Sequence, residues 1–286
     1  MRLYRFTFFD FAMYAIVTVV TVVCFFPFIY VLSVSFTDPS VYVPFEFSLI
    51  PKKFSLKVYA SILNSGAFLQ AINNTVLVTV VGTIISVFAT FAFSYGLTKK
   101  DLPFVRLFMW FVIFGLLFDP GIIPNYMNIR SLGMINSYWS LILPAVMISW
   151  NVIIAKSFIE GIPGELEDAA KIDGASYFGI FFRIILPLAT ASIATLTLFI
   201  AVNQWNQYIK PLLYITDFRK RTIQVYLKAL LDTSLGMGEA GDGSVALPTE
   251  TLRLATVVLA MAPIMAVYPF VQRYFVKGVM IGSVKG

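Results

Sequence analysis

The sequence contains no histidine and a single cysteine, Cys24, which lies within a long apolar run. A disulfide within the chain and a cysteine-based metal site are therefore excluded. Without histidine the chain also lacks the usual zinc and haem ligands, the base of Ser-His catalytic sites and histidine proton relays. No Gly-x-Ser-x-Gly elbow is present, so the sequence gives no support for a membrane-embedded hydrolase.

Charged residues are also scarce. They make up 13% of the 286 residues, whereas 59% of the chain is hydrophobic. A typical soluble domain carries about 25% charged residues, so this composition predicts a protein of the lipid bilayer. The net charge of +6 comes from basic residues scattered between apolar runs, which favours attraction to anionic lipid head groups over binding to nucleic acid.

Long uncharged runs predict an all-α membrane protein with six transmembrane helices, because a helix needs about 20 apolar residues to cross a bilayer. The third run, residues 107–118, is short and lies between Arg106 and Asp119, so it crosses only if Arg106 snorkels. An even number of spans puts both termini on one side, but Lys and Arg are distributed too evenly to decide which side. The other five expected spans are residues 11–37, 71–98, 137–156, 184–209 and 254–272.

A polar segment, residues 160–174, interrupts the apolar runs and carries five acidic residues. Pro163 suits the first turn of a helix, and Gly174 is placed to end that helix in a left-handed conformation. Ser176 can then cap a second short helix. The small residues Ala169 and Ala170 allow another surface to approach closely, beside acids that can pair with its Lys or Arg. A helix resting on lipid head groups is the alternative, but such helices are usually basic on their polar face.

A second polar patch, residues 203–208, follows the expected fifth span. It combines amides with aromatic rings, which suits sugars because rings stack on their apolar faces and amides bond their hydroxyls. An aromatic belt at the membrane surface is the alternative. The following loop, residues 210–253, is Gly-rich and is expected to be flexible and solvated. The candidates for a substrate path are Asn151, Asn203, Gln204, Trp205, Asn206 and Tyr208.

The polar segment resembles a known motif. Asp168-Ala169-Ala170 is followed after three residues by Gly174, and after nine more by Ile184-Ile185-Leu186-Pro187. This resembles the cytoplasmic signature loop of ABC-importer permeases, which reads Glu-Ala-Ala, three residues, Gly, nine residues, Ile-x-Leu-Pro. The one departure is Asp168, where the family more often has Glu. Residues 123–126, 143–144 and 204–206 are similar to the carbohydrate-importing, MalG-like branch of these binding-protein-dependent permeases.

The resemblance implies a type I ABC-importer permease (MetI-like) fold with a cytoplasmic coupling helix. It also implies two regions, an N-terminal span with an extracellular loop at residues 1–70 and a permease core at residues 71–286, with the coupling loop at residues 160–187. In the family this loop seats on an ATPase subunit. The residues expected to make that contact are Glu167, Asp168, Ala169, Ala170, Asp173, Gly174 and Pro187.

The implied function is non-catalytic: the chain would translocate a sugar or oligosaccharide delivered by an extracellular binding protein. No G-x-x-x-x-G-K-[ST] phosphate loop is present, so ATP and Mg are expected on two separate ATPase subunits, and no cofactor is expected in this chain. A second, homologous permease would complete a heterodimer. The family location is the bacterial cytoplasmic (inner) membrane, with both termini in the cytoplasm.

An ion-coupled secondary carrier or channel is the alternative function. Such proteins need titratable or ion-coordinating groups within the membrane. The first, second, fifth and sixth expected spans carry no charged residue, and Asp119 in the run Asp119-Pro120-Gly121 is typical of a turn.

Overall fold

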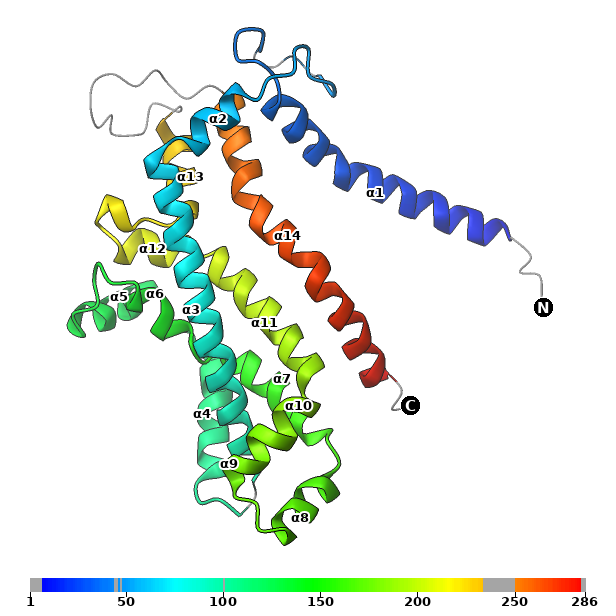
Figure 1. The fold of residues 1–286 in the computed structure, drawn as a ribbon, viewed down its shortest axis with the longest axis vertical. Helices are drawn as coiled ribbons and strands as arrows, with labels where there is room; N and C mark the ends of the chain where they lie inside the picture. Colours follow the sequence, from blue (N-terminus) through cyan, green and yellow to red (C-terminus); the bar gives the residue numbers. More distant parts are fainter. Residues whose placement is uncertain (1–6, 44–45, 47, 100, 234–249, 284–286) are drawn as a thin grey trace. The chain divides into compact units, whose positions relative to one another are not determined.

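The computed structural model describes residues 7–43, 46, 48–99, 101–233 and 250–283 (Figure 1). For residues 233 and 268 and from residue 270 onward only the backbone is described. Across these residues the chain is helical, with no strand and one isolated bridge between Thr37 and Phe54. The all-α prediction is therefore confirmed.

Three helices are long and apolar enough to cross a bilayer, and they lie at the expected first, second and sixth spans. They are α1 (Phe8–Ser35), α3 (Gly66–Leu97) and the part of α14 (Glu250–Ser283) up to Val267. Thr7 caps α1, because its hydroxyl accepts the Asp10 N–H while the Asp10 carboxylate accepts the Thr7 N–H. The apolar side chains of α1 are exposed along its length, as expected for a helix whose neighbours are lipid or another chain.

The expected fourth and fifth spans are each a bent pair of helices and not one continuous helix. The fourth bends by 47° and the fifth by 81°. Proline lacks an N–H and clashes with the carbonyl four residues earlier, so it disturbs a helix on its N-terminal side; before Pro187 this disturbance coincides with a π-helical turn, while both bends lie after the prolines, Pro144 and Pro187. The fourth comprises α6 (Trp139–Ile142), η1 (Leu143–Ala145) and α7 (Ser149–Glu160). The fifth comprises α9 (Tyr177–Ile180), the π-helical turn η2 (Phe181–Ile185), α10 (Leu186–Leu188) and α11 (Thr190–Trp205).

The expected third span is a short helix, α4 (Val105–Leu117), of 13 residues. At 1.5 Å per residue it is about 20 Å long, less than the thickness of a bilayer core. The described residues thus hold three full-length candidates, up to five if each bent pair counts as one span, and this shorter apolar helix. Six spans requires α4 to cross as well. The Gly121 N–H donates to Asp119 Oδ1 at 2.9 Å, so Asp119 forms the expected turn before α5 (Ile122–Ser131).

The segment after α11 is more ordered than predicted. Residues 210–233 are largely helical, and residues 235–243 lie outside the described residues. The side chain of Asn74 on α3 donates to the carbonyls of Arg219 and Arg221 at 2.9 and 3.0 Å, and the Ile223 N–H donates to Thr75 Oγ1 at 2.8 Å. These bonds satisfy loop backbone groups that composition alone cannot reveal. The helices are α12 (Ile209–Tyr214), η3 (Phe218–Lys220) and α13 (Ile223–Thr233).

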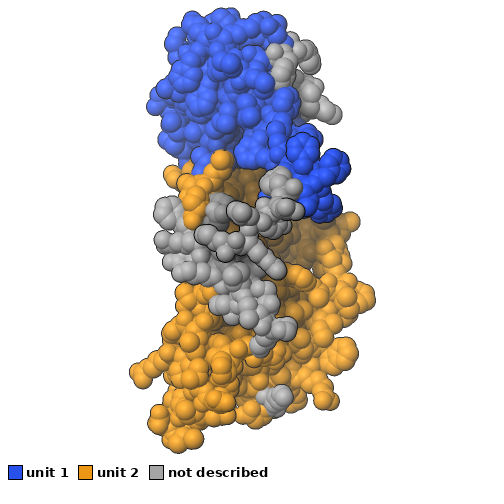
Figure 2. Space-filling view, turned by 90° about the vertical axis from the view of Figure 1, so that its right-hand side faces the viewer, with its two compact units in different colours: residues 1–69, 227–262 blue, residues 70–226, 263–286 orange. Residues whose placement is uncertain are grey.

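The chain forms two compact units, coloured separately in Figure 2. One unit comprises residues 1–69 and 227–262 and includes α1 and α2 (Lys57–Leu63). The other comprises residues 70–226 and 263–286. The compact units group residues 227–262 with the N-terminal segment. The predicted division into regions 1–70 and 71–286 stays a prediction.

The core of the second unit joins α3, α7 and the helices from α9 to α11. Small hydroxyl residues on α3 allow close approach: Ser86 donates to the Ala145 carbonyl at 3.2 Å, and Ser94 donates to the Val152 carbonyl at 3.0 Å. This core supports the polar segment that connects α7 to α9. Its buried residues are Phe91, Tyr95, Ala155, Ile159, Ile180, Phe181, Ile185, Ala189 and Leu196.

Candidate functional site

The acidic segment folds as a helix, a tight turn and a second helix, as the sequence predicts. The helix α8 (Gly164–Ile172) carries acids in its first turn and Lys171 in its last, both favourable to the helix dipole. Gly174 follows it with φ 81°. The Ala175 N–H donates to the Ala170 carbonyl at 2.9 Å and the Gly174 N–H to the Lys171 carbonyl at 3.0 Å, which together form a Schellman motif. Ser176 then caps α9 by accepting the Gly179 N–H at 3.2 Å. We call α8, the turn and α9 the α8–α9 hairpin.

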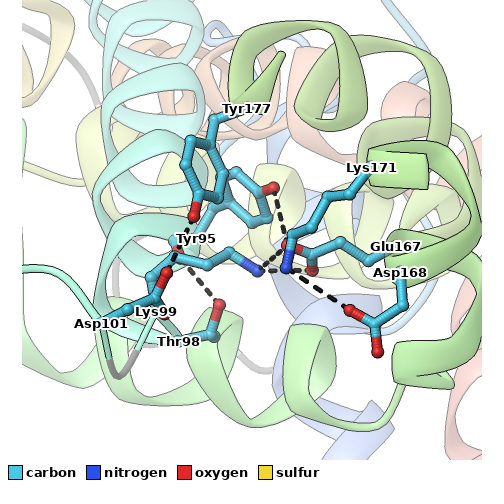
Figure 3. A network of polar contacts seen from close by, with 8 residues as sticks. All are labelled: Tyr95, Thr98, Lys99, Asp101, Glu167, Asp168, Lys171 and Tyr177. Atoms are coloured by element: carbon cyan, nitrogen blue, oxygen red, sulfur yellow. Dashed lines mark hydrogen bonds and ion pairs between the residues drawn. The ribbon is translucent and has the colours of Figure 1, made fainter. Parts of the chain in front are cut away.

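The inner side of α8 is fixed to the end of α3 by a buried ion pair (Figure 3). Lys99 donates to both carboxylate oxygens of Glu167, and the two side chains are 9% and 13% exposed. The Tyr95 hydroxyl also donates to Glu167, at 3.3 Å, and the Lys99 ammonium lies 4.2 Å from the centre of the Tyr95 ring. A charge pair that is this buried and this well bonded fixes geometry, because removal of Glu167 leaves the Lys99 charge uncompensated.

A second bond fixes α9 to the same loop. The Tyr177 hydroxyl donates to Asp101 Oδ2 at 2.8 Å, and this bond holds the pKa of the Asp101 carboxyl below its usual value. Lys171 lies 3.6 Å from Glu167 and 3.5 Å from Asp168 (Figure 3), and its side chain is 41% exposed. The loop after α3 therefore holds both arms of the α8–α9 hairpin, α8 through Lys99 and α9 through Asp101.

The outer side of the hairpin is open to solvent. No residue of α8 is buried, and the Asp168 side chain is 73% exposed. Ile172 is 87% exposed and Phe178 is 78% exposed. Large apolar side chains at such exposure on a segment that otherwise carries acids are typical of a surface that another protein covers. We call Asp168, Ala169, Ile172, Asp173 and Phe178 the outer face.

Sequence reasoning missed Ile172 and Phe178. The sequence offers little signal for them, because Ile162 and Leu166 are also apolar within residues 160–174 and Phe178 lies beyond that segment. Of the residues expected to contact an ATPase, Asp168, Ala169, Asp173 and Gly174 are exposed. Glu167 instead turns inward to Lys99, and Ala170 packs against the core of the second unit. Pro187 lies in α10, at the bend before α11, and not on α8.

The amide and aromatic patch at the end of α11 separates into two groups. Asn203, Asn206 and Tyr208 line an open groove of about 920 Å³. Gln207 and Lys210 also line it, together with apolar residues of α11 and Ile264. We call this the α11 groove. Sequence reasoning placed Lys210 in the following loop and did not include it among the candidates.

The other three path candidates lie elsewhere. Gln204 is 3% exposed and packs on Gly82 of α3, where a Cβ would come within 2.9 Å of its Nε2. Trp205 is 6% exposed and lines an adjoining apolar pocket of about 410 Å³, which shares Leu198, Val202 and Ile264 with the groove. Asn151 is 7% exposed on α7 and is not part of the groove lining. The structure therefore brings Asn203, Asn206 and Tyr208 together, and turns Gln204, Trp205 and Asn151 away from the groove.

Comparison with known proteins agrees with this architecture. Residues 102–281 match the sequence model of a family described as "Binding-protein-dependent transport system inner membrane component". The chain is 42% identical over 282 residues to the polygalacturonan/rhamnogalacturonan transport system permease protein YtcP of Bacillus subtilis (strain 168), covering 97% of this chain and 98% of that one. It is 41% identical over 263 residues to protein LplC of the same organism, covering 91% and 89%.

Solved structures show the same fold. A chain from the crystal structure of a bacterial ABC transporter involved in the import of the acidic polysaccharide alginate matches with a TM-score of 0.85 and 26% identity, covering 93% of this chain and 96% of that chain. A chain from the alginate transporter in complex with its alginate pentasaccharide-bound periplasmic protein matches at 0.56 and 14% identity, covering 92% and 93%, which supports the fold alone.

The chain belongs to the family of binding-protein-dependent transport system inner membrane components. It is a multi-pass membrane permease subunit of the ABC-importer class, as the signature loop predicts.

Proposed function

We propose that this chain is the permease subunit of an importer for an oligosaccharide, with an ATPase subunit docked on the outer face of the α8–α9 hairpin. The observation that supports the proposal best is the contrast between the two sides of α8. Its inner side is fixed by the Lys99–Glu167 pair, whereas its outer face exposes Ile172 and Asp168. A surface that is rigidly held and yet uncovered suits force transfer from a partner.

The proposed mechanism is mechanical. Closure of two ATPase subunits around ATP would move the hairpin, and the bonds from Glu167 and Tyr177 would carry that movement to the end of α3. The chain has no phosphate loop of its own, so ATP and Mg belong to the ATPase subunits. A homologous permease would complete the path, and the α8–α9 hairpin and both termini would face the cytoplasm.

The proposed cargo follows from the relatives. One relative is named for polygalacturonan and rhamnogalacturonan, and one matched structure concerns import of the acidic polysaccharide alginate. The α11 groove offers what a sugar requires: amide groups on Asn203 and Asn206 for hydroxyls, and the Tyr208 ring for an apolar sugar face. An extracellular binding protein would deliver the oligosaccharide to this end of α11.

Crosslinking tests the docking surface. In a Cys24→Ser background, Ala169→Cys should capture the ATPase subunit through a short bifunctional thiol-to-amine reagent in membranes that contain the complete transporter. The matched control, Arg219→Cys on the exposed η3 turn, should capture none and should react with an impermeant maleimide added outside the cell. Capture from Arg219→Cys, or external labelling of Ala169→Cys, would reject the proposed orientation.

Transport assays distinguish the main alternative. Uptake by proteoliposomes containing the complete transporter should require ATP inside and should persist when a protonophore removes the proton gradient. Uptake that needs the gradient and not ATP would instead identify an ion-coupled carrier.

A further inference from the structure

The α11 groove contains one charged side chain among its lining residues, all of which lie in the described part of the chain. That side chain is Lys210, the second residue of α12. Burial lowers the pKa of Lys210 below its usual value, while Asp119 acts in the opposite direction. Lysine carries a compact, strongly hydrated charge, so partial removal from water favours an anionic partner there.

The other polar groups of the groove point to a sugar. Asn203 and Asn206 are three residues apart and share one side of α11 with Phe199 and Val202, the side that lines the groove. Gln204 instead continues the buried side of Leu196 and Ile200. The helix thus buries the Gln204 amide, whereas the amides of Asn203 and Asn206 line the same groove as Lys210.

The groove also lies where incoming cargo would arrive. Its lining residues on α11 begin at Leu198 and so belong to the second half of a 16-residue helix that starts at Thr190. The α8–α9 hairpin precedes the other end of this helix. The groove is therefore on the side remote from the proposed ATPase, the external side in the proposed orientation.

We propose that Lys210 recognises the carboxylate of a uronic-acid residue in the transported oligosaccharide, while Asn203 and Asn206 bond the hydroxyls of the same sugar. This inference rests on the proposed function and assigns the chemistry of its cargo: an acidic oligosaccharide is preferred over a neutral one of equal length. A charge-assisted bond from an ammonium to a carboxylate is stronger than the neutral bonds around it, so Lys210 provides most of the discrimination.

Uptake of trigalacturonate by the complete reconstituted transporter tests the proposal. Lys210→Gln should lower uptake at subsaturating substrate by about tenfold, the effect of losing one charge-assisted bond. Lys210→Arg, which keeps the charge, should retain at least half of the wild-type rate. The control Lys228→Gln removes a lysine of α13 that pairs with Asp232 and is not part of the groove, and should leave uptake unchanged. Equal uptake by Lys210→Gln and wild type would overturn the proposal.

A second measurement uses the wild-type transporter and does not depend on how the variants fold. A carbodiimide should join the carboxylate of labelled trigalacturonate to the Lys210 amine, and peptide mapping should find the label there and not on Lys228. Excess unlabelled trigalacturonate should compete, whereas its carboxyl-reduced, neutral form should not. Absence of label from Lys210 would also overturn the proposal.

The carboxyl-reduced trisaccharide distinguishes a failure of the proposed transport function from a failure of the proposed role of Lys210. If the wild-type transporter imports neither form with ATP, the proposed function fails. If it imports the neutral form as well as or better than trigalacturonate, the proposed function stands and the role of Lys210 is wrong.

Discussion

Two adjacent acids illustrate how differently neighbouring residues can act. The Glu167 side chain is 13% exposed and paired with Lys99, whereas the Asp168 side chain is 73% exposed. Successive side chains of an α-helix project about 100° apart, so two adjacent residues of α8 give one internal attachment and one exposed carboxylate. Sequence reasoning grouped both acids as ATPase contacts, because the partner of Glu167 lies 68 residues earlier in the chain and no local pattern indicates it.

The first prediction concerns Glu167. Glu167→Gln keeps the shape of the side chain and leaves the Lys99 charge without its partner, so it should lower the free energy of unfolding by about 3 kcal/mol. Unfolding in mixed detergent and SDS, followed by circular dichroism, measures this loss.

Asp168→Asn is the matched control, since it removes a charge from the adjacent exposed position. It should leave the free energy of unfolding within about 0.5 kcal/mol of wild type, as is usual for surface changes, and should weaken ATPase association in a pull-down. A destabilised Asp168→Asn together with an unaffected Glu167→Gln would contradict the division between inner side and outer face.

At the scale of elements, hydropathy predicts positions well and shape poorly. The uncharged runs locate α1, α3 and α14 because span length is set by bilayer thickness. They do not reveal the bends of 47° and 81°, since a break within a span depends on how neighbouring helices satisfy the freed backbone groups. The turn η3 and the helix α13 were missed for a related reason: side chains of α3, Asn74 and Thr75, bond their backbone groups. The end of α8 was predictable, because left-handed glycine is a local requirement.

The second prediction concerns that glycine. No atom lies within 4 Å of a Cβ built on Gly174, so Gly174→Ala acts through its φ of 81° alone. It should destabilise the turn by about 1–2 kcal/mol. We expect reduced ATPase activity in response to loaded binding protein, with normal assembly. Gly164→Ala is the control, because it also meets no atom within 4 Å and has no positive φ. Equal effects of the two substitutions would contradict this explanation.

The third prediction concerns the packing of α3 against α11. A Cβ at Gly82 would lie 2.9 Å from Gln204 Nε2, and Gln204 is buried with little room to move. Gly82→Ala should therefore lower the free energy of unfolding by about 1–3 kcal/mol. Gly96→Ala on the same helix meets nothing within 4 Å and should be neutral or stabilising by up to about 1 kcal/mol. The same SDS titration compares the two, and a Gly82→Ala protein as stable as Gly96→Ala would show that Gln204 moves freely.

At the scale of the whole molecule, the sequence predicted the class and much of the function, and the structure added which residues work together. The signature loop spacing carried the family assignment, which the family match over residues 102–281 confirms. The α11 groove could not be predicted in full, because hydrophobic runs do not show which side of α11 carries Asn203 and which carries Gln204. Its charged member, Lys210, belongs to the next helix.

The fourth prediction tests whether α1 crosses the membrane. Cys24 is exposed within α1 and lies in its apolar run. In intact membranes it should react with a lipophilic maleimide and resist a charged, impermeant one, and SDS should abolish the difference. Rapid labelling by the charged reagent before SDS would place α1 outside the bilayer. Because Cys24 is the single cysteine, the wild-type chain itself serves as the reporter.

The exposure of Ile172 and Phe178 has a consequence for how the cell produces this subunit. If the ATPase covers this surface, a subunit synthesised in excess of the ATPase would keep these two apolar side chains in contact with water. Exposed apolar surface promotes aggregation and recognition by chaperones and proteases. Synthesis of the two polypeptides in equal amounts, as co-transcription provides, would let the ATPase subunit cover these side chains soon after translation. Surplus subunit would be degraded rather than stored.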